Sequence, residues 1–319
     1  MISPYNGLCL LAGTAHVDLA ERISSLIEHP LCAADVGRFP DGEVNIKVGE
    51  DVRGKDVFII QPTCPPVNEN LVELLALIDC CRRSSVGRMT AVMPYFGYAR
   101  KDRKDEGRVP ITAKVVADCL TSVGVDRVIT MDLHAPQIQG FFNVPVDHLY
   151  AKPVFKKRFG ELEQDSTVVV APDAGGIKMA RAYATMLGIS FAIIDKRRMG
   201  PDQVVSEHLI GDVDGRDVII VDDMIATGGT IVDAARRCRE HGANSVTLAA
   251  THGVFAGPAL ERMAKAHEEG LVQRVIITDS VCPQADYPDV IEVLSVAPLL
   301  AEAIHRIHVC RSVSSLFVD

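Results

Sequence analysis

The chain has 319 residues, and its 33 Lys and Arg against 42 Asp and Glu give a formal net charge of −9, which argues against a general nucleic-acid binder. At about 100–200 residues per domain, this length predicts about two domains. No apolar run approaches the ~20 residues that span a membrane, and the start of the chain lacks the basic region of a signal peptide. The nine cysteines show no CxxC spacing, which favours reduced thiols in a cytoplasmic protein.

Short apolar runs alternate with helical patterns along the chain and predict β-strands. The clearest runs cover 56–61, 88–95, 127–133, 167–173, 190–196, 217–223, 245–250 and 274–280. They are almost continuously apolar, which is typical of parallel strands that are covered on both faces. Several runs end in an acid or a threonine, and ligands of open α/β sheets bind beyond the carboxyl ends of the strands. Polar segments at 99–110 and 196–208 predict exposed loops, the second with a turn at Gly200-Pro201.

An internal repeat indicates that the chain contains two similar α/β domains. Residues 52–70 align with residues 213–230, and the identical pairs include Gly54 with Gly215 and Asp56 with Asp217. Each copy is followed by a helical pattern and another strand, so we expect the domains to meet near residues 149–153. The second copy carries two acids and a glycine-rich turn where the first has Gln61 and Pro62, so only the second keeps a phosphate-type loop.

The strongest chemical signal lies at 218–238, where a buried strand ends at Asp222-Asp223 and a turn, ATGGT, follows at 226–230. Its two glycines let the backbone curl so that several N–H groups point inward, and the next helix adds partial positive charge at its amino end. That helix has its apolar residues at helical spacing and a stop at Gly242 (Ile231, Ala234, Ala235 and Cys238). This combination predicts a phosphate monoester site in which the acids accept from sugar hydroxyls, directly or through Mg²⁺. An ordinary strand–turn–helix connection is the alternative, and the cost of burying two adjacent acids without a ligand disfavours it.

The segment resembles the phosphoribosyl diphosphate (PRPP) loop that phosphoribosyltransferases share with PRPP synthetases. Further motifs resemble those of the ribose-phosphate pyrophosphokinase family in the same order: RFPDGE (38–43), PYFGYARKDRK (94–104), RVPITAK (108–114), DLHAPQIQGFF (132–142), APDAGG (171–176) and DKRR (195–198). The resemblance covers almost the whole chain and implies an α/β fold of two similar phosphoribosyltransferase-like domains with mainly parallel sheets. It implies that residues 1–149 form an ATP-side and oligomerisation domain and 150–319 a ribose-phosphate-binding domain, with the C-terminal tail packing back on the first.

The same resemblance implies a reaction in which Mg·ATP and ribose 5-phosphate give PRPP and AMP, by attack of the sugar's C1 hydroxyl on the β-phosphorus. It also implies a homo-oligomer, typically a hexamer, whose ATP site is shared between subunits, and no nucleic-acid or membrane partner. Diphosphoryl transfer needs neutralisation of charge more than covalent chemistry, and Lys196 and Arg198 are the implied catalytic cations. His134 and Asp173 are the implied metal contacts for Mg²⁺.

The other site residues that the resemblance implies fall into two groups. The ATP-binding group contains Phe39, Asp41, Gly42, Glu43, Arg100, Lys101 and Asp102, and the ribose-phosphate-binding group contains Arg198, Asp222, Asp223, Ala226, Thr227, Gly228, Gly229 and Thr230. Phe39 offers a face for stacking on adenine, and the carboxylates of Asp41 and Glu43 can accept from its amino group.

Two positions depart from the family pattern. Ala226 replaces an acid near the ribose, and Lys101 stands where glutamine is frequent. The first departure leaves open a non-catalytic regulatory partner that assembles with an active synthetase. A phosphoribosyltransferase that consumes PRPP is a further alternative, although it would need neither RFPDGE nor the 99–104 segment. Residues 49–56 imitate a P-loop, but Asp56 stands where Ser or Thr is needed and the segment precedes a strand.

Overall fold

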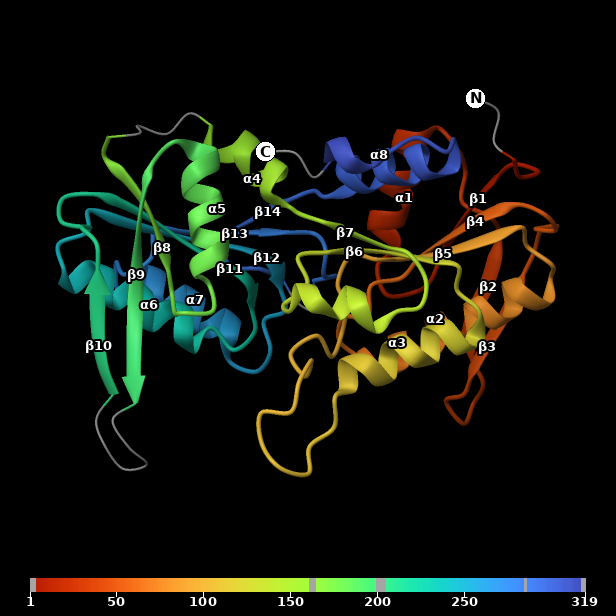
Figure 1. Cartoon of the computed structure of the whole chain (residues 1–319), viewed down its shortest axis with the longest axis horizontal. Helices are drawn as coiled ribbons and strands as arrows, with labels where there is room; N and C mark the ends of the chain where they lie inside the picture. The colour runs from red at the N-terminus through yellow and green to blue at the C-terminus, as the bar shows by residue number, and fades with distance from the viewer. Residues whose placement is uncertain (1–3, 161–164, 199–204, 284–285, 317–319) are drawn as a thin grey trace. The chain divides into compact units, whose positions relative to one another are not determined.

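The computed structural model describes residues 4–160, 165–198, 205–283 and 286–316, with the backbone alone at 195–198 and 205–207 (Figure 1). These residues form two compact units. Unit 1 consists of the described residues of Met1–Tyr150, Ser280–Cys282 and Val296–Val318, and unit 2 of those of Ala151–Asp279 and Pro283–Ser295. Among the described residues, no helix combines the length and the apolar character that crossing a membrane requires.

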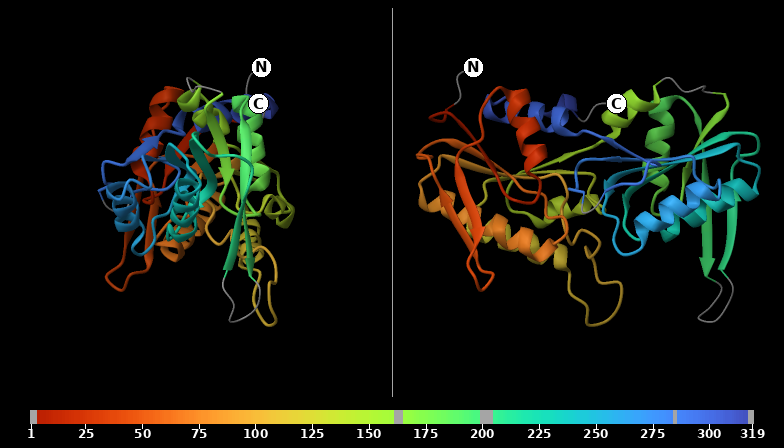
Figure 2. Two further views of the ribbon diagram at one scale, coloured as in Figure 1. Left: turned by 90° about the vertical axis from the view of Figure 1, so that its left-hand side faces the viewer. Right: turned by 180° about the vertical axis from the view of Figure 1, so that it is seen from behind.

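Unit 1 is built on a five-stranded sheet with the order β1-β4-β5-β6-β7, in which all neighbours are parallel. Its strands are β1 (Leu8–Ala12), β4 (Asp56–Ile60), β5 (Arg88–Met93), β6 (Arg127–Met131) and β7 (Val146–Leu149). Helices α2 (Val67–Arg83) and α3 (Thr112–Val123) cover one face, and α1 (Val17–Ile27) and α8 (Ala297–His308) the other (Figures 1 and 2). An antiparallel hairpin of β2 (Ala34–Arg38) and β3 (Val44–Val48) lies outside this sheet, and two short 3₁₀ helices, η1 (Pro136–Phe141) and η2 (Ser314–Leu316), complete the unit.

Unit 2 is built on a seven-stranded sheet with the order β10-β9-β8-β11-β12-β13-β14. Its strands are β8 (Thr167–Ala171), β9 (Ser190–Arg198), β10 (Val205–Ile210), β11 (Asp217–Ile225), β12 (Ser245–Gly253), β13 (Arg274–Thr278) and β14 (Ile291–Leu294). Only the edge strand β10 runs antiparallel to its neighbour. Helices α4 (Lys152–Phe159) and α5 (Ile177–Leu187) lie on one face, and α6 (Gly229–Glu240) and α7 (Ala259–Glu268) on the other (Figure 2).

The two units repeat one topology. The order β1-β4-β5-β6-β7 of unit 1 recurs as β8-β11-β12-β13-β14 in unit 2, and in each unit a hairpin, β2–β3 or β9–β10, precedes the second of these strands along the chain. The sequence repeat is visible in the backbone, because Gly54 before β4 and Gly215 before β11 have left-handed φ angles of 68° and 67°. The prediction of two similar α/β domains with mainly parallel sheets is therefore confirmed.

The predicted loops had different outcomes. Between β5 and α3, residues 99–110 form neither helix nor strand, as predicted. The loop prediction for 196–208 is wrong at both ends, because β9 continues to Arg198 and β10 begins at Val205. These ends form an antiparallel hairpin at the edge of the sheet, where a strand can carry charged residues because water reaches it. The predicted turn at Gly200-Pro201 lies outside the described residues.

Candidate functional site

Two carboxyl groups lie at the carboxyl end of β11, where the apolar core of the strand stops. Residues 218–221 are buried, whereas Asp222 and Asp223 are partly exposed, and the Asp223 amide donates to Oδ1 of Asp222 at 2.9 Å. Burial, with the charges of Asp223 and Asp173, raises the pKa of Asp222 to about 8. A hydroxyl donor or a cation at this position would stabilise the charged carboxylate, so the acids are suited to bind a polyhydroxylated or metal-bound ligand.

The loop that follows is fixed from behind by α7 and the segment after β12. The Ala226 carbonyl accepts the Ala256 amide at 2.8 Å, and the Thr227 carbonyl accepts a guanidinium N–H of Arg262 at 2.8 Å. Gly228 has a left-handed φ of 76°, and a Cβ there would lie 2.5 Å from Cε of Met263. The chain can therefore make this turn without strain only with glycine, and helix α6 begins at the next residue, Gly229.

Helix α6 gives the loop its electrostatic character. Its buried face consists of Ile231, Ala234, Ala235 and Cys238, as the sequence predicted, and Gly242 follows its end with a φ of 87°. The first N–H groups of a helix have no acceptor inside it, and they carry partial positive charge. The exposed Thr227 and Thr230 flank these groups, so the loop offers donors suited to a phosphate.

Asp173 lies at the same edge of the sheet, because β8 and β11 are parallel neighbours. Its Oδ1 accepts the amides of Gly175 and Gly176 at 2.8 and 3.2 Å, which fixes the carboxylate at the start of α5. Its charge contributes to the raised pKa of Asp222. Unit 2 thus brings together three acids and the 226–230 loop.

Lys196 and Arg198 belong to the carboxyl end of β9, which pairs with β8. The register pairs Ala171, the last residue of β8, with Ile193, so the backbone at 196–198 continues beyond the edge at which Asp173 lies. The side chains of Lys196 and Arg198 are outside the description that the structure gives, and their roles stay predictions.

In unit 1, the RFPDGE motif forms the tip of the β2–β3 hairpin. The Phe39 amide donates to the Glu43 carbonyl at 2.8 Å, the Gly42 amide donates to the Phe39 carbonyl at 2.9 Å, and the Asp41 carboxylate accepts the Glu43 amide at 3.1 Å. Gly42 has a φ of 94°, which its lack of a side chain permits. The Phe39 side chain is 48% exposed, and such a large apolar surface on a polar tip is suited to stack on a flat ligand.

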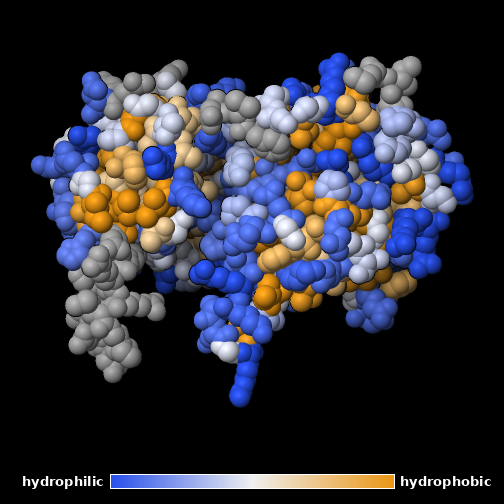
Figure 3. Space-filling view, in the orientation of Figure 1, coloured by the Kyte–Doolittle hydropathy of each residue, from blue (hydrophilic) through white to orange (hydrophobic). Residues whose placement is uncertain are grey.

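The segment that carries Arg100, Lys101 and Asp102 projects from unit 1 between β5 and α3, and its surface is strongly hydrophilic (Figures 1 and 3). Arg100 and Lys101 are exposed, and Nζ of Lys101 lies 3.1 Å from the carboxylate of Asp105, whose pKa it lowers. Oδ2 of Asp102 accepts the side-chain amide of Gln137 at 2.5 Å. The predicted ATP contacts therefore lie on two separate segments of unit 1: the tip of the β2–β3 hairpin and the loop between β5 and α3.

The two predicted metal contacts belong to different units. His134 is exposed just after β6 in unit 1, and Asp173 belongs to unit 2. Within the described ranges, no cluster of three or more His, Cys, Asp or Glu side chains has metal-binding geometry. The carboxylate of Asp173 is nevertheless a donor of the kind that Mg²⁺ prefers, and Mg²⁺ is usually held by one or two carboxylates together with water and substrate phosphates.

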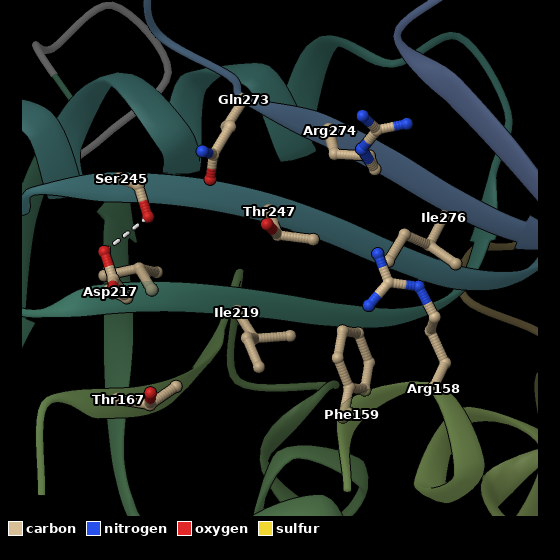
Figure 4. Close-up of a pocket in the computed structure, with 11 residues that line it drawn as sticks. Arg158, Phe159, Thr167, Asp217, Ile219, Ser245, Thr247, Gln273, Arg274 and Ile276 are labelled. Carbon is tan, nitrogen blue, oxygen red and sulfur yellow. Dashed lines mark hydrogen bonds between the residues drawn. The ribbon is translucent and has the colours of Figure 1, made fainter. Parts of the chain in front are cut away.

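A cavity of ≈ 270 Å³ lies at the opposite end of unit 2 (Figure 4). Its lining includes the first residues of four strands (Thr167, Asp217, Ser245 and Arg274). Its two arginines, Arg158 and Arg274, flank Glu292, which Arg158 contacts at 2.7 Å. Because ligands of open α/β sheets bind at the carboxyl ends, and these cations already face a carboxylate, the cavity is not the candidate site.

Comparison with known proteins agrees with the geometry. The family model for the N-terminal domain of ribose phosphate pyrophosphokinase matches residues 8–124, and the model for the phosphoribosyl transferase domain matches residues 150–282. The "Ribose-phosphate pyrophosphokinase" of Rhodopirellula baltica is 52% identical over 97% of this chain and 98% of its own length, and that of Helicobacter pylori 49% identical over 98% and 96%. A crystal structure of phosphoribosylpyrophosphate synthetase from Mycobacterium smegmatis is 40% identical, covers 95% of this chain and 99% of its own, and superposes with a TM-score of 0.88.

Proposed function

Because the chain belongs to the ribose-phosphate pyrophosphokinase family, we propose that it transfers the β,γ-diphosphoryl group of ATP to the C1 hydroxyl of ribose 5-phosphate. The C1 oxygen bonds to the β-phosphorus, the bond from that phosphorus to the α,β-bridging oxygen breaks, and the hydroxyl proton is released to water. The products are AMP and PRPP, a precursor for nucleotide biosynthesis.

One observation carries the proposal: an acidic pair and a phosphate-type loop occupy the same end of β11. Asp222 and Asp223 would accept hydrogen bonds from the ribose hydroxyls, and the 226–230 loop with the amino end of α6 would bind the 5-phosphate. Burial and the charge of Asp223 raise the pKa of Asp222, which supports this role, because a hydroxyl donor or a cation that reaches the carboxylate replaces part of the lost solvation.

The chemistry requires positive charge around the migrating group. Lys196 and Arg198 would supply it from the end of β9, by contacting the phosphate oxygens as charge builds up in the transition state. His134 and Asp173 would hold Mg²⁺, which supplies further neutralisation to the ATP phosphates when it is bound. The chain's own contribution is to bind both substrates and to align the C1 hydroxyl with the β-phosphorus.

Unit 1 would provide the nucleotide side. Phe39 would stack on adenine, Asp41 and Glu43 would accept from its amino group around the turn at Gly42, and the 100–102 segment would contact the phosphates. We further propose a homohexamer in which this hairpin serves the ATP site of a neighbouring subunit. Light scattering of the purified chain, with and without ATP, tests the assembly.

The reaction is tested by incubating the purified protein with ATP, ribose 5-phosphate and Mg²⁺ and separating the nucleotides by chromatography. We expect equal amounts of AMP and PRPP, with ³²P from the β-position of ATP recovered in PRPP. A folded, oligomeric protein that forms no AMP at any phosphate concentration would contradict the proposal. Loss of PRPP from added stock, with release of diphosphate when a base is supplied, would instead support a phosphoribosyltransferase.

A second candidate, a non-catalytic regulatory partner, rests on Ala226 alone. That residue is partly buried and its carbonyl is held by the Ala256 amide, so the loop backbone does not depend on a side chain there. Activity of the isolated protein, without any related chain present, distinguishes this candidate from an active synthetase.

A further inference from the structure

A buried carboxylate in unit 1 lies at the centre of a polar network that the proposed reaction does not use. Glu73, on helix α2, has a fully buried side chain. Its Oε1 accepts the Thr14 amide at 2.6 Å, the Thr14 hydroxyl at 2.9 Å and the side-chain amide of Gln61 at 2.9 Å. Its Oε2 lies 2.8 Å from a guanidinium nitrogen of Arg38. Such a carboxylate is costly to bury and is retained only with partners of this kind.

The network occupies the place in unit 1 that corresponds to the candidate sugar-phosphate site of unit 2. Gln61 directly follows β4, and the sequence repeat aligns it with Asp222. Its Oε1 accepts the Ala15 amide at 3.0 Å, in the loop between β1 and α1. A Cβ on Gly13 would lie 2.3 Å from that same oxygen, so side chains fill the space closely. The unit 1 counterpart of the site is therefore filled by the protein's own carboxylate and amide groups.

Arg38 connects this filled site to the hairpin tip. It is the last residue of β2, adjacent to Phe39, and its side chain is 29% exposed where it meets Glu73. Val36 and Ile46 of the hairpin pack against the apolar core of unit 1, whereas the tip beyond Arg38 is exposed and polar apart from Phe39. An ion pair to a buried group on helix α2 therefore fixes the end of β2 at the point where the tip begins.

We propose that Glu73 is a positioning residue that acts through Arg38 to hold the tip, Phe39–Glu43, in the orientation that receives the nucleotide. This inference rests on the proposed function, which assigns ATP to the tip. A tip that is already ordered loses less conformational entropy when the ligand binds, so the ion pair increases affinity for ATP without touching it. The sugar-phosphate site, whose residues belong to unit 2, gains nothing from it.

The test compares Glu73→Gln, which keeps the shape and removes the charge, with Asp79→Asn as a matched control. Asp79 also lies on α2 and pairs with Arg83 at 2.7 Å, but both side chains are exposed. We expect Glu73→Gln to raise the KM for ATP about tenfold and to leave the KM for ribose 5-phosphate within about twofold, whereas Asp79→Asn changes neither. Equal increases in both constants, or no increase in either, would overturn the inference.

Arg38→Leu provides a second route, because its partly exposed side chain can be replaced even if Glu73→Gln does not fold. We expect it to raise the KM for ATP by a similar factor, and the double variant to be no worse than the more affected single variant, since both remove one interaction. A double variant whose effects multiply would show that the two side chains act independently, and would overturn the inference.

Hydrogen exchange separates this inference from the proposed function. The amides of Phe39 and Gly42 are hydrogen-bonded within the tip, and Glu73→Gln should make both exchange at least about fivefold faster, whatever ligand the protein binds. If the unmodified protein makes no AMP, the proposed function fails, but the exchange rates of these amides still test whether Glu73 holds the tip. Faster exchange with an unchanged KM for ATP in an active enzyme would overturn the nucleotide role.

Discussion

The Asp223 amide donates to Oδ1 of Asp222 over 2.9 Å, which holds two carboxyl groups side by side near the end of β11. Burial and the neighbouring acids raise the pKa of Asp222 from 3.8 to about 8, so between these pH values the folded chain binds more protons than the unfolded chain. The stabilisation from this protonation is complete below about pH 4 and is lost as the pH rises through about 8.

Asp222→Asn removes this titration. We expect its free energy of unfolding, relative to that of the parent, to rise by about 1–3 kcal/mol between pH 5 and pH 8.5, because the buried Asp222 of the parent must ionise over this range. Asp233→Asn, at an exposed position of α6, is the control and should show no such pH dependence. If the difference between Asp222→Asn and the parent were the same at both pH values, the raised pKa would be wrong.

Two adjacent glycines of the loop should respond differently to alanine. Gly228→Ala meets a left-handed φ and a Cβ position 2.5 Å from Cε of Met263, so we expect a loss of about 1–2 kcal/mol and a severalfold weaker affinity for ribose 5-phosphate. Gly229→Ala begins α6, and its Cβ would lie 3.5 Å from the Arg262 guanidinium, an ordinary contact. It should therefore keep the parent's melting temperature, which thermal denaturation measures. A larger loss at Gly229 would contradict the loop geometry.

The contrast between these glycines and the Glu73 network explains how much of the site the sequence could predict. Residues 222–230 are contiguous, and a strand, a turn and a helix in that order are readable as a pattern along the chain. Glu73 and Arg38 are far apart in sequence, and Glu73 reads as an ordinary polar residue in a helix until the fold brings it under the hairpin. The signal that could have found it is the repeat, because Gln61 replaces an acid there and needs buried partners.

The strands of the fold also differ in how well the sequence predicts them. Strands such as β4 and β11 were predicted because buried parallel strands are continuously apolar. The strands of the β2–β3 hairpin were missed because they are half-exposed and too short and polar to stand out: β3 alternates apolar and polar residues, and β2 has no continuous apolar run. The edge strand β10 was missed because three consecutive polar residues interrupt it (Ser206, Glu207 and His208). Local sequence identifies what must be buried on both faces, whereas edge strands depend on tertiary neighbours.

Restoring an acid at position 226 tests the departure from the family pattern. Ala226→Asp adds a carboxylate beside the proposed ribose site, and the backbone there is already fixed by the Ala256 amide at 2.8 Å. We expect the affinity for ribose 5-phosphate, measured by calorimetry, to stay unchanged or to tighten by up to about threefold, the scale of one added hydrogen bond to solvent-accessible sugar. A collapse of activity would show that the loop has adapted to alanine.

The proposed catalytic cations should affect turnover more than substrate binding. We expect Lys196→Ala and Arg198→Ala each to lower kcat about 100-fold or more, with the KM for ribose 5-phosphate within about threefold, because they would act mainly in the transition state. Arg197→Ala is the control, since alternate positions of a strand share a face and its position lies between the other two. Steady-state kinetics that follow AMP formation measure both constants and test this prediction. Losses confined to KM would assign these residues to ground-state binding instead.

Asp56 and Asp217 occupy equivalent positions of the sequence repeat, but one is buried and the other is exposed. Asp56 is fully buried and accepts Arg88 at 2.6 and 2.8 Å and Nδ1 of His308 at 2.9 Å, which ties α8 to the sheet of unit 1. Asp217 is exposed and accepts only the Ser245 hydroxyl among the contacts described for it, at 2.6 Å.

The same substitution should therefore have very different effects at these positions. Asp56→Asn leaves the partly buried cation of Arg88 without its counter-charge, and we expect a loss of about 3 kcal/mol in the free energy of unfolding, measured in urea. Asp217→Asn should cost about 0.5 kcal/mol or less, because water replaces what the carboxylate loses. Equal losses at the two positions would contradict this reasoning, because they would show that the contacts of Asp56 with Arg88 and His308 stabilise unit 1 no more than the single contact of an exposed carboxylate does.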